Sequence, residues 1–327
     1  MNETIKIVRF HFTEPFHIGE LSEGIRKTAR YFIHSDTLWG GLVANWINIY
    51  GNLDLLKGYW DGSPPFRVSS IFPVIGDKYY IIKPLTLPKK SIAVEYKEYQ
   101  LEKEYKKVQL IPLNLLSEYL NDRVSKNQVI QEWKEIKNKI EYVVEPKVRL
   151  GPTSAASVIY YVSRVKTAKD LDFYFLIQVN ELKFYEILSP VLKLLSETGL
   201  GGHRSKGNGR FELHNEDRIF MDYDSVSKYS SFSEDYGYIL ISLLSPKEDN
   251  INEILKDSTF QLIERGGWAL DSIKKEQAFE KRVFMVKEGS ILRKKLFGHL
   301  PDVTPRNWNL KITRYGLGMY LPFVEEE

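Results

Sequence analysis

The segment that decides the fold is residues 199–211, which read Gly-Leu-Gly-Gly-His-Arg-Ser-Lys-Gly-Asn-Gly-Arg-Phe. Glycine tolerates positive φ angles and leaves room for a second backbone, so such a run can bring N–H groups close to an anion. The tip, His203 to Lys206, adds the positive charge that attracts phosphates. The segment alone leaves two interpretations open, a phosphate-binding loop and a flexible connection between two elements.

The elements on either side of this loop argue against two nucleotide-binding loops. Apolar spacing predicts a helix before the loop, capped by Ser189, with Pro190 as its first residue and Gly199 at its end. The alternation of residues 210–213 predicts a strand after it. A dinucleotide-binding loop needs the strand first, and a nucleotide P-loop needs a lysine where this chain has Asn208. Both nucleotide sites are therefore excluded.

The composition sets limits on the class of protein. With 327 residues, of which 43% are hydrophobic, the chain can form one large or two ordinary domains. Its 46 basic and 43 acidic residues leave a charge of only +3, so a nucleic-acid surface would have to be a local patch. The absence of cysteine excludes disulfides, thiol catalysis and thiolate metal sites. The six histidines have no zinc-ligand spacing, so we expect no metal and no cofactor.

The same sequence predicts a cytoplasmic protein with no membrane partner. It begins without an apolar signal region, and no uninterrupted apolar stretch is long enough to cross a bilayer.

The order of predicted elements favours an α+β fold. The spacing of apolar residues predicts strands and one helix in four segments, which are 5–12, 35–50 (the helix), 68–74 and 172–179. With the helix and strand around the glycine loop, the order becomes β-α-β-β-α-β, the ferredoxin-like unit shared with RNA-recognition domains. We therefore expect a first ferredoxin-like domain over residues 1–222 and a second, degenerate one over 236–327. In the second, we expect a short helix over 251–256 and strands over 260–263, 283–286 and 311–321.

Charges of both signs crowd together between residues 83 and 147 and interrupt this order. We expect an insertion in the first domain, thumb-like and spanning 83–170, with a hairpin around 147–166. A compact apolar group from Leu110 to Leu120 should dock on the parent domain or on a partner. The polar stretch 95–107 should add little to the fold.

The most tempting catalytic cluster is His34-Ser35-Asp36, at the start of the first predicted helix. A histidine beside a carboxylate could act as an acid–base pair in RNA cleavage. In the alternative, which we favour, Ser35 or Asp36 caps the helix and His34 contacts backbone or RNA, because a helix start attracts phosphate without catalysis. His203 is the other acid–base candidate, and there too we favour binding.

Three further clusters combine cations with turns or glycines. Arg149, Thr153 and Ser154 belong to the expected hairpin, where they would touch phosphates or lie on a solvated edge strand. Glu264-Arg265-Gly266-Gly267-Trp268 and Arg314-Tyr315-Gly316-Leu317-Gly318 each place a cation beside a tight backbone site. Either of these two could also be only a bulge or a close strand crossing.

Together with His34-Ser35-Asp36-Thr37-Leu38 and Ser69-Ser70-Ile71-Phe72-Pro73, these motifs resemble the RAMP superfamily of CRISPR proteins. The resemblance is to the fourth subunit of the type III-A Csm interference complex, and it runs from the first strand to Pro322. It implies two ferredoxin-like (RRM-like) domains and a non-catalytic subunit that binds the 5′ handle of the guide RNA (crRNA). It also implies partners: a large polymerase-like subunit, a backbone RAMP subunit, and target RNA near the guide 5′ end.

The resemblance makes the glycine loop the RNA contact, whereas Arg149, Arg265 and Arg314 are assigned from charge and position. The predicted RNA-binding residues are Gly201, Gly202, His203, Arg204, Ser205, Lys206, Gly207, Arg210, His34, Ser35, Arg149, Thr153, Ser154, Arg265, Gly266, Gly267 and Arg314. The alternative function is a RAMP endoribonuclease that processes crRNA precursors through His34 or His203.

Overall fold

The computed structural model describes most of the chain. The described residues are 4–19, 26–27, 31–85, 96–150, 157–223, 237–247, 252, 256–271, 276–306 and 308–321.

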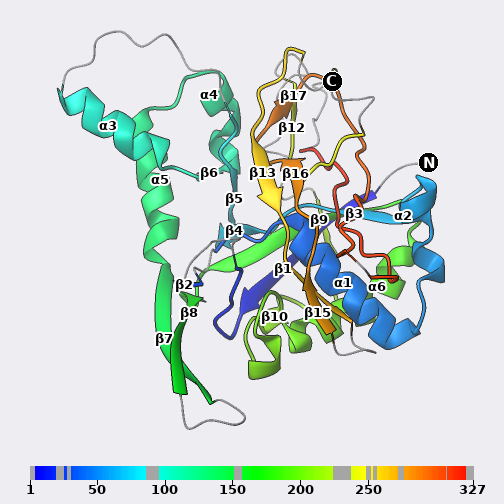
Figure 1. The fold of residues 1–327 in the computed structure, drawn as a ribbon. Coiled ribbons are helices and arrows are strands. Elements are labelled where there is room, and N and C mark those ends of the chain that lie inside the picture. The colour runs from blue at the N-terminus through cyan, green and yellow to red at the C-terminus, as the bar shows by residue number, and fades with distance from the viewer. Residues whose placement is uncertain are drawn as a thin grey trace.

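The centre of the molecule is an antiparallel sheet, which has eight strands in the described residues. Its main order is β10-β1-β9-β4-β5-β6, while β11 pairs with β1 and β3 with β9 (Figure 1). The strands are β1 (Thr4–Phe12), β3 (Phe66–Val68), β4 (Phe72–Ile75), β5 (Lys78–Ile82), β6 (Leu110–Pro112), β9 (Asp172–Val179), β10 (Phe211–Leu213) and β11 (Met221–Asp222).

β1, β9 and β10 form where the sequence predicted strands, whereas β5, β6 and β11 were not predicted. β1 and β9 pair in the register Ile7 opposite Leu176, and nearly every side chain of β9 is buried because β9 lies inside the sheet. The strand expected over 68–74 is divided into β3 and β4. Ser69 lies between them, and its hydroxyl accepts a hydrogen bond from the Leu176 amide at 2.8 Å. This side-chain bond replaces a regular ladder contact at the break.

Two long helices follow β1 and β9 and pack against each other, α1 (Ser35–Tyr50) and α6 (Lys183–Thr198). With the insertion set aside, the order β1-α1-β3/β4-β9-α6-β10 agrees with the predicted β-α-β-β-α-β order. α1 forms where the apolar spacing predicted a helix, but its predicted cap is wrong: neither Ser35 nor Asp36 caps it, and the N-cap residue is His34, without a side-chain bond.

The predicted start of α6 is wrong. The helix begins seven residues before Pro190, which lies inside it instead of at its first position. A proline inside a helix removes one backbone hydrogen bond. The helix continues through it because its apolar side is buried on both sides of the proline, from Phe184 to Leu195. The predicted end is confirmed, since Gly199 closes the helix by donating its N–H to the Leu195 carbonyl at 2.8 Å.

Part of the predicted insertion is built into the main sheet and core. β6 pairs with β5, and Leu110, Ile111 and Leu116 belong to the main hydrophobic cluster, as expected for an apolar group that docks on its parent. The segment also contains the helices α3 (Tyr96–Lys106), α4 (Leu116–Leu120) and α5 (Lys126–Asn138). The expectation that residues 95–107 add little to the fold is corrected, because Leu101 and Tyr105 of α3 pack against the core.

A long hairpin follows α5 and projects away from the central sheet (Figure 1). It consists of β7 (Ile140–Leu150) and β8 (Ser157–Thr167), so the predicted hairpin is confirmed and is longer than expected. Near the middle of β8, at Tyr161 and Val162, the hairpin pairs in parallel with the short strand β2 (Arg26–Lys27). Residues 151–156, with Thr153 and Ser154, lie outside the described part of the chain.

The second half consists of short antiparallel strand pairs. β12 pairs with β17, β13 with β16, and β14 with β15. Their bounds are β12 (Tyr238–Ile239), β13 (Leu262–Arg265), β14 (Trp268–Asp271), β15 (Glu276–Phe279), β16 (Val283–Val286) and β17 (Ile291–Leu292). The strand expected over 311–321 is corrected to isolated bridges at Thr313, Leu317 and Tyr320. The helix predicted for 251–256 falls mostly outside the described residues.

The two halves share a core. Leu240, Leu244, Val286, Leu292 and Leu296 form a small cluster of their own, but other residues of the second half belong to the main cluster. These are Ile239, Ile241, Tyr315, Leu317, Met319 and Leu321. Three short turns complete the described elements: α2 (Gly58–Asp61) and the 3₁₀ turns η1 (Asp54–Leu56) and η2 (Leu113–Leu115). No described helix is both long and apolar enough to cross a bilayer.

Candidate functional site

A solvent-open cleft of about 320 Å³ lies where the two halves of the chain meet. The glycine loop forms one wall, the turn 265–268 forms another, and the start of α1 lies between them. The predicted clusters at 199–211, 265–267 and 314 are therefore brought together, although they are far apart in the sequence. Segment 17–19, which belongs to none of the predicted clusters, completes the lining.

Arginine is the charged residue type in the described lining of this cleft. Its described lining contains three arginines, Arg204, Arg265 and Arg314, and no acidic side chain. Arg204 is exposed on the 3₁₀ turn η3 (Arg204–Lys206), whereas the other two side chains are each only 13% exposed. Cations at the rim and at the base of an otherwise small-residue cleft favour a polyanionic ligand.

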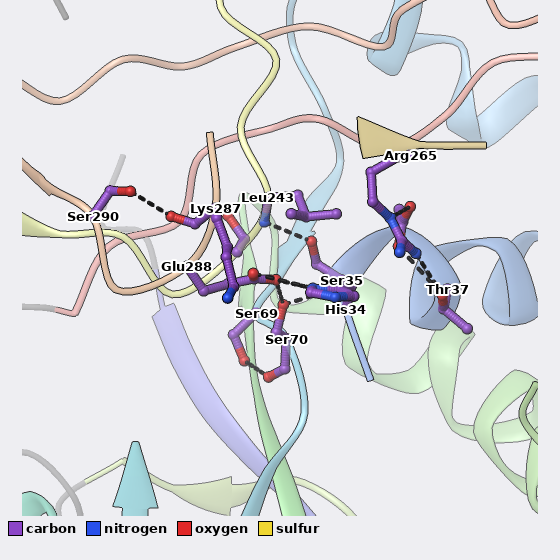
Figure 2. Close-up of polar contacts among 12 residues, drawn as sticks. His34, Ser35, Thr37, Ser69, Ser70, Leu243, Arg265, Lys287, Glu288 and Ser290 are labelled. Atoms are coloured by element: carbon purple, nitrogen blue, oxygen red, sulfur yellow. Dashed lines mark hydrogen bonds and ion pairs between the residues drawn. The ribbon is translucent and has the colours of Figure 1, made fainter. Parts of the chain in front are cut away.

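The Asp36 carboxylate holds Arg265 and Arg314 in place. Both carboxylate oxygens accept hydrogen bonds from Arg265, from Nε and Nη2 at 2.9 Å each, and one also accepts from Nη1 of Arg314. Figure 2 shows Arg265 reaching the first turn of α1 beside Thr37. Glu280 accepts a further bond from Arg314. Burial alone would raise the pKa of Asp36, but the two guanidinium charges outweigh it and hold that pKa far below its usual value.

His34 and Ser35 do not line the cleft; they join the two halves (Figure 2). The Nδ1 atom of His34 lies 2.9 Å from a carboxylate oxygen of Glu288, which also accepts a bond from the Ser70 hydroxyl. The Ser35 hydroxyl accepts from the amide of Leu243 at 2.9 Å. Both side chains are at least 95% buried, so their geometry serves the fold, and RNA contact at these two residues stays a prediction.

The charge of Glu288 depends on this network. Burial acts to raise the pKa of Glu288, but the interactions with His34 and with the Ser70 hydroxyl outweigh burial. The pKa therefore lies below its ordinary value of 4.5. The cluster predicted as a possible acid–base pair is therefore a set of buried contacts, in which each side chain has a partner in the second half of the chain.

Most glycines of the loop serve close packing. Gly201 has φ +89°, and a Cβ there would lie 2.5 Å from the His17 carbonyl oxygen. The N–H of Gly202 donates to that same carbonyl, and the N–H of Gly209 donates to the Pro15 carbonyl. These two amides are used inside the protein, so the idea that the whole run offers its N–H groups to an anion is corrected for them. The exposed basic tip carries the charge.

Two histidines lie together beside the glycine loop. The ring centroids of His17 and His203 are 5.1 Å apart, and Nδ1 of His17 lies 2.7 Å from the Ser163 carbonyl oxygen, to which it donates. His203 has a left-handed backbone with φ +58°. No local pattern marks His17 as a site residue, because its contact with the loop is made across a large sequence separation.

The remaining predicted residues lie outside the cleft lining. Ser205, Lys206 and Arg210 are exposed around the loop. Arg149 lies on β7 opposite Val158, within the projecting hairpin. None of these is brought to the cleft, so the predicted set is divided between a cleft, a buried joint, the loop surface and the hairpin.

The cleft also contains residues that the predictions lacked. Thr37, Gly40 and Gly41 line it from the first turns of α1, and Trp268 lines it from the start of β14. Their spacing along α1 places the first three on one face of the helix, a pattern that could have been found from the sequence. Among the described residues, no group of three or more histidines and carboxylates could hold a metal ion.

Comparisons with known proteins agree with this architecture. Residues 233–323 match the family model described as the CRISPR Csm4 C-terminal domain. A Csm4 protein of Methanocaldococcus jannaschii is 26% identical, and the match covers 94% of each chain. A Csm4 protein of Streptococcus thermophilus is 23% identical over 93% of this chain and 95% of the relative.

Solved structures share the fold. A chain in the crystal structure of a Csm3–Csm4 subcomplex of the type III-A CRISPR–Cas interference complex superimposes with a TM-score of 0.64. That chain is 24% identical, and the match covers 98% of this chain and 99% of that one. A chain of a Csm1–Csm4 cassette in complex with cA4 gives a TM-score of 0.61 at 20% identity, over 99% of both chains. Residues 233–323 thus match the Csm4 C-terminal domain, the chain is similar to two Csm4 proteins over nearly its whole length, and it shares the fold of the solved Csm4 chains.

Proposed function

We propose that the chain is a non-catalytic, RNA-binding subunit of a type III CRISPR interference complex, and that it holds the 5′ handle of the crRNA. The observation that carries this proposal is the cleft, where Arg204, Arg265 and Arg314 converge from three distant motifs without an acidic residue in the described lining. Converging arginines suit the phosphates of a polynucleotide, and the exposed Arg204 can offer the paired hydrogen bonds that a guanidinium makes to phosphate oxygens. Arg265 and Arg314 make their paired bonds to Asp36 and Glu280, so these two arginines line the base of the cleft in a fixed position.

Single-stranded RNA fits this cleft better than a duplex. Proteins hold unpaired strands through backbone phosphates together with bases stacked on aromatic rings. The cleft offers both, with arginines along it and Trp268 in its wall. The exposed tip at Arg204 and Lys206 extends the positive surface beyond the cleft.

The similarity to relatives supports the assembly that we propose. Related chains have been solved in a Csm3–Csm4 subcomplex and in Csm1–Csm4 cassettes. We infer that this chain likewise links a large, polymerase-like Csm1-type subunit to a backbone RAMP subunit of the Csm3 type. The strand order β10-β1-β9-β4 with α1 and α6 supports a ferredoxin-like first domain, and the short strand pairs after Gly237 would form the degenerate second one.

The projecting hairpin has a separate part in the proposal. Tyr142, Val144, Val148, Ile159 and Tyr161 leave large apolar surface exposed on β7 and β8. We assign this hairpin as the thumb-like extension that meets target RNA near the guide 5′ end or a neighbouring subunit, since a stable free surface of this kind is normally covered in an assembly.

A second candidate function is the RAMP endoribonuclease, and one observation favours it. The rings of His17 and His203 lie together, as an acid–base pair for RNA cleavage would need to, and His17 lines the cleft with the arginines whereas His203 does not. His34, the other residue considered for this function, is buried against Glu288 and does not line the cleft. We favour binding because the contact that positions His17, its bond to the Ser163 carbonyl, is one that packing alone explains.

The test is the salt dependence of RNA binding. In fluorescence anisotropy with a single-stranded RNA carrying the repeat-derived handle, Arg204→Ala/Lys206→Ala should bind more weakly than the wild type. The magnitude of the slope of log K against log salt should fall by about 0.7 for each lost phosphate contact, or about 1.4 for the pair.

The matched control is Lys57→Ala/Lys183→Ala, which removes two exposed lysines of the same charge from sites outside the cleft lining. It should leave the slope within error of the wild type. An unchanged slope in the Arg204/Lys206 variant, or an equal change in the control, would remove the loop from the RNA-binding surface.

A further inference from the structure

Trp268 and Phe279 form an exposed aromatic pair beside the cleft. They lie directly opposite each other in the β14–β15 ladder, and their ring centroids are 3.7 Å apart with an interplanar angle of 33°. Their exposed fractions are 58% and 61%, so two large rings stack on each other while much of their surface faces solvent. Such a pair is held in place by cross-strand contact and not by burial in the core.

The pair has one side that belongs to the cleft. Trp268 lines the cleft together with Arg265 and Gly267, whereas Phe279 is not part of the lining. Phe279 therefore supports the indole from the opposite strand and leaves indole surface for a ligand. One further bond extends the same ladder beside the ring pair, since the Glu280 amide donates to the Gly267 carbonyl at 3.0 Å.

The surroundings of the indole indicate what the ligand is. Arg204, Arg265 and Arg314 line the same cleft, and its described lining has no acidic residue. A flat aromatic surface beside several cations matches a nucleotide unit, which has a flat base next to a phosphate. A peptide ligand would satisfy the cations with carboxylates but would have no general need for a supported indole.

We propose that Trp268, supported by Phe279, is a stacking platform for one unpaired base of the RNA bound in the cleft. The arginines contact phosphates of the same strand. This inference rests on the proposed function and adds a base contact to it. Because every base has a π-face, the platform fixes the position of the strand and does not select its sequence.

The experiment compares Trp268→Ala and Trp268→Phe in the full chain. The probe is a short, unstructured, fluorescein-labelled RNA, intact or with one abasic site placed at successive positions. Trp268→Ala should weaken binding of the intact RNA about ten-fold, and Trp268→Phe much less, since phenylalanine keeps an aromatic face. The salt slope of Trp268→Ala should equal that of the wild type, because no phosphate contact is lost.

The abasic series locates the platform. One abasic position should weaken binding to the wild type, because the base that stacks on Trp268 is missing. The same position should not weaken binding to Trp268→Ala, because that variant has already lost the stacking contact. Phe284→Ala is the control: Phe284 is 65% exposed on the adjacent strand β16 and does not line the cleft, so its loss should leave RNA binding unchanged.

The outcomes separate this inference from the function on which it rests. If Trp268→Ala binds RNA like the wild type while Arg204→Ala/Lys206→Ala binds more weakly, the platform is wrong and the RNA-binding loop stands. If neither variant binds more weakly, both the stacking platform and the RNA-binding loop are wrong. If Trp268→Ala keeps full RNA affinity but loses assembly with the large subunit, the ring pair is a protein contact and the platform is overturned.

Discussion

Replacing Asp36 by asparagine is expected to destabilise the chain by about 3–5 kcal/mol, the cost of removing one partner from a buried ion pair. Asparagine has the same size and keeps one acceptor oxygen, so the change removes the charge without leaving a cavity. The side chain of Asp36 is fully buried, and it is bonded to Arg265 and Arg314, which are each 13% exposed. The variant leaves two guanidinium groups buried with Glu280 as the remaining carboxylate partner of Arg314.

The magnitude follows from the contrast with an exposed pair of the same chemistry. Glu264 and Arg282 form an ion pair with side chains 35% and 55% exposed. Exposed pairs contribute about 0–1 kcal/mol, since water screens the charges and both side chains lose freedom. Glu264→Gln is therefore the matched control, and it should change the stability by well under 1 kcal/mol.

The assay is urea unfolding followed by tryptophan fluorescence. With an m-value of about 3 kcal/mol/M, a loss of 3–5 kcal/mol lowers the midpoint by about 1–1.7 M. The control should move the midpoint by less than about 0.3 M. A shift in Asp36→Asn no larger than in the control would refute the reasoning, because the carboxylate would then not hold the two arginines and the two halves together.

Three further predictions concern other parts of the molecule. Purified chain incubated with crRNA precursor and magnesium should leave the RNA intact on a gel, and specific cleavage that His203→Ala abolishes would favour the endoribonuclease instead. Glu288→Gln should be less stable than the wild type near neutral pH. Because the folded-state pKa of Glu288 lies below 4.5, this stabilisation is present above that pH and is lost as the pH falls through the folded value. Thermal midpoints of the two proteins should therefore converge in acid, and a constant difference at every pH would contradict the assignment. Leu101→Ala should cost about 1 kcal/mol, less than for a fully buried leucine because Leu101 is partly buried. An unchanged thermal midpoint would mean that the packing of α3 against the core adds no measurable stability.

Local patterns predicted the elements of the first half well. β1, α1 and β9 were found from apolar spacing, because each segment has one buried side or lies wholly inside the sheet. The end of α6 at Gly199 was also predicted from a local pattern, because glycine commonly follows the last residue of a helix. The start of α6 was missed because a proline normally marks the first turn, and only the packing of the helix on the core shows that it tolerates Pro190 inside.

The second half was harder to predict because its strands are short and its contacts distant. Residues 311–321 alternate as a strand would, yet they make only isolated bridges, since each bridge is to a different segment. The segment contains apolar residues because Tyr315 and Leu317 are buried in the main core, and this burial needs no regular strand ladder.

The candidate site was predicted as separate clusters and not as one arrangement. Glycines and cations marked the clusters that line the cleft, and binding of an anion there stays a prediction. Their partners could not be predicted: Asp36 meets Arg265 and Arg314 across 229 and 278 positions of sequence. No local pattern shows which distant residues will be partners. The cluster at His34 was therefore considered as a possible acid–base pair, whereas its side chains contact residues of the second half.

The most direct test of RNA binding in the cleft is photo-crosslinking of the full chain to handle RNA that carries 4-thiouridine at each position in turn. Mass spectrometry then identifies the crosslinked peptides. Our account predicts crosslinks to the segments that line the cleft, at 199–204 and 265–268. RNA that binds the chain but crosslinks only to the β7–β8 hairpin, or to surfaces away from both segments, would contradict it.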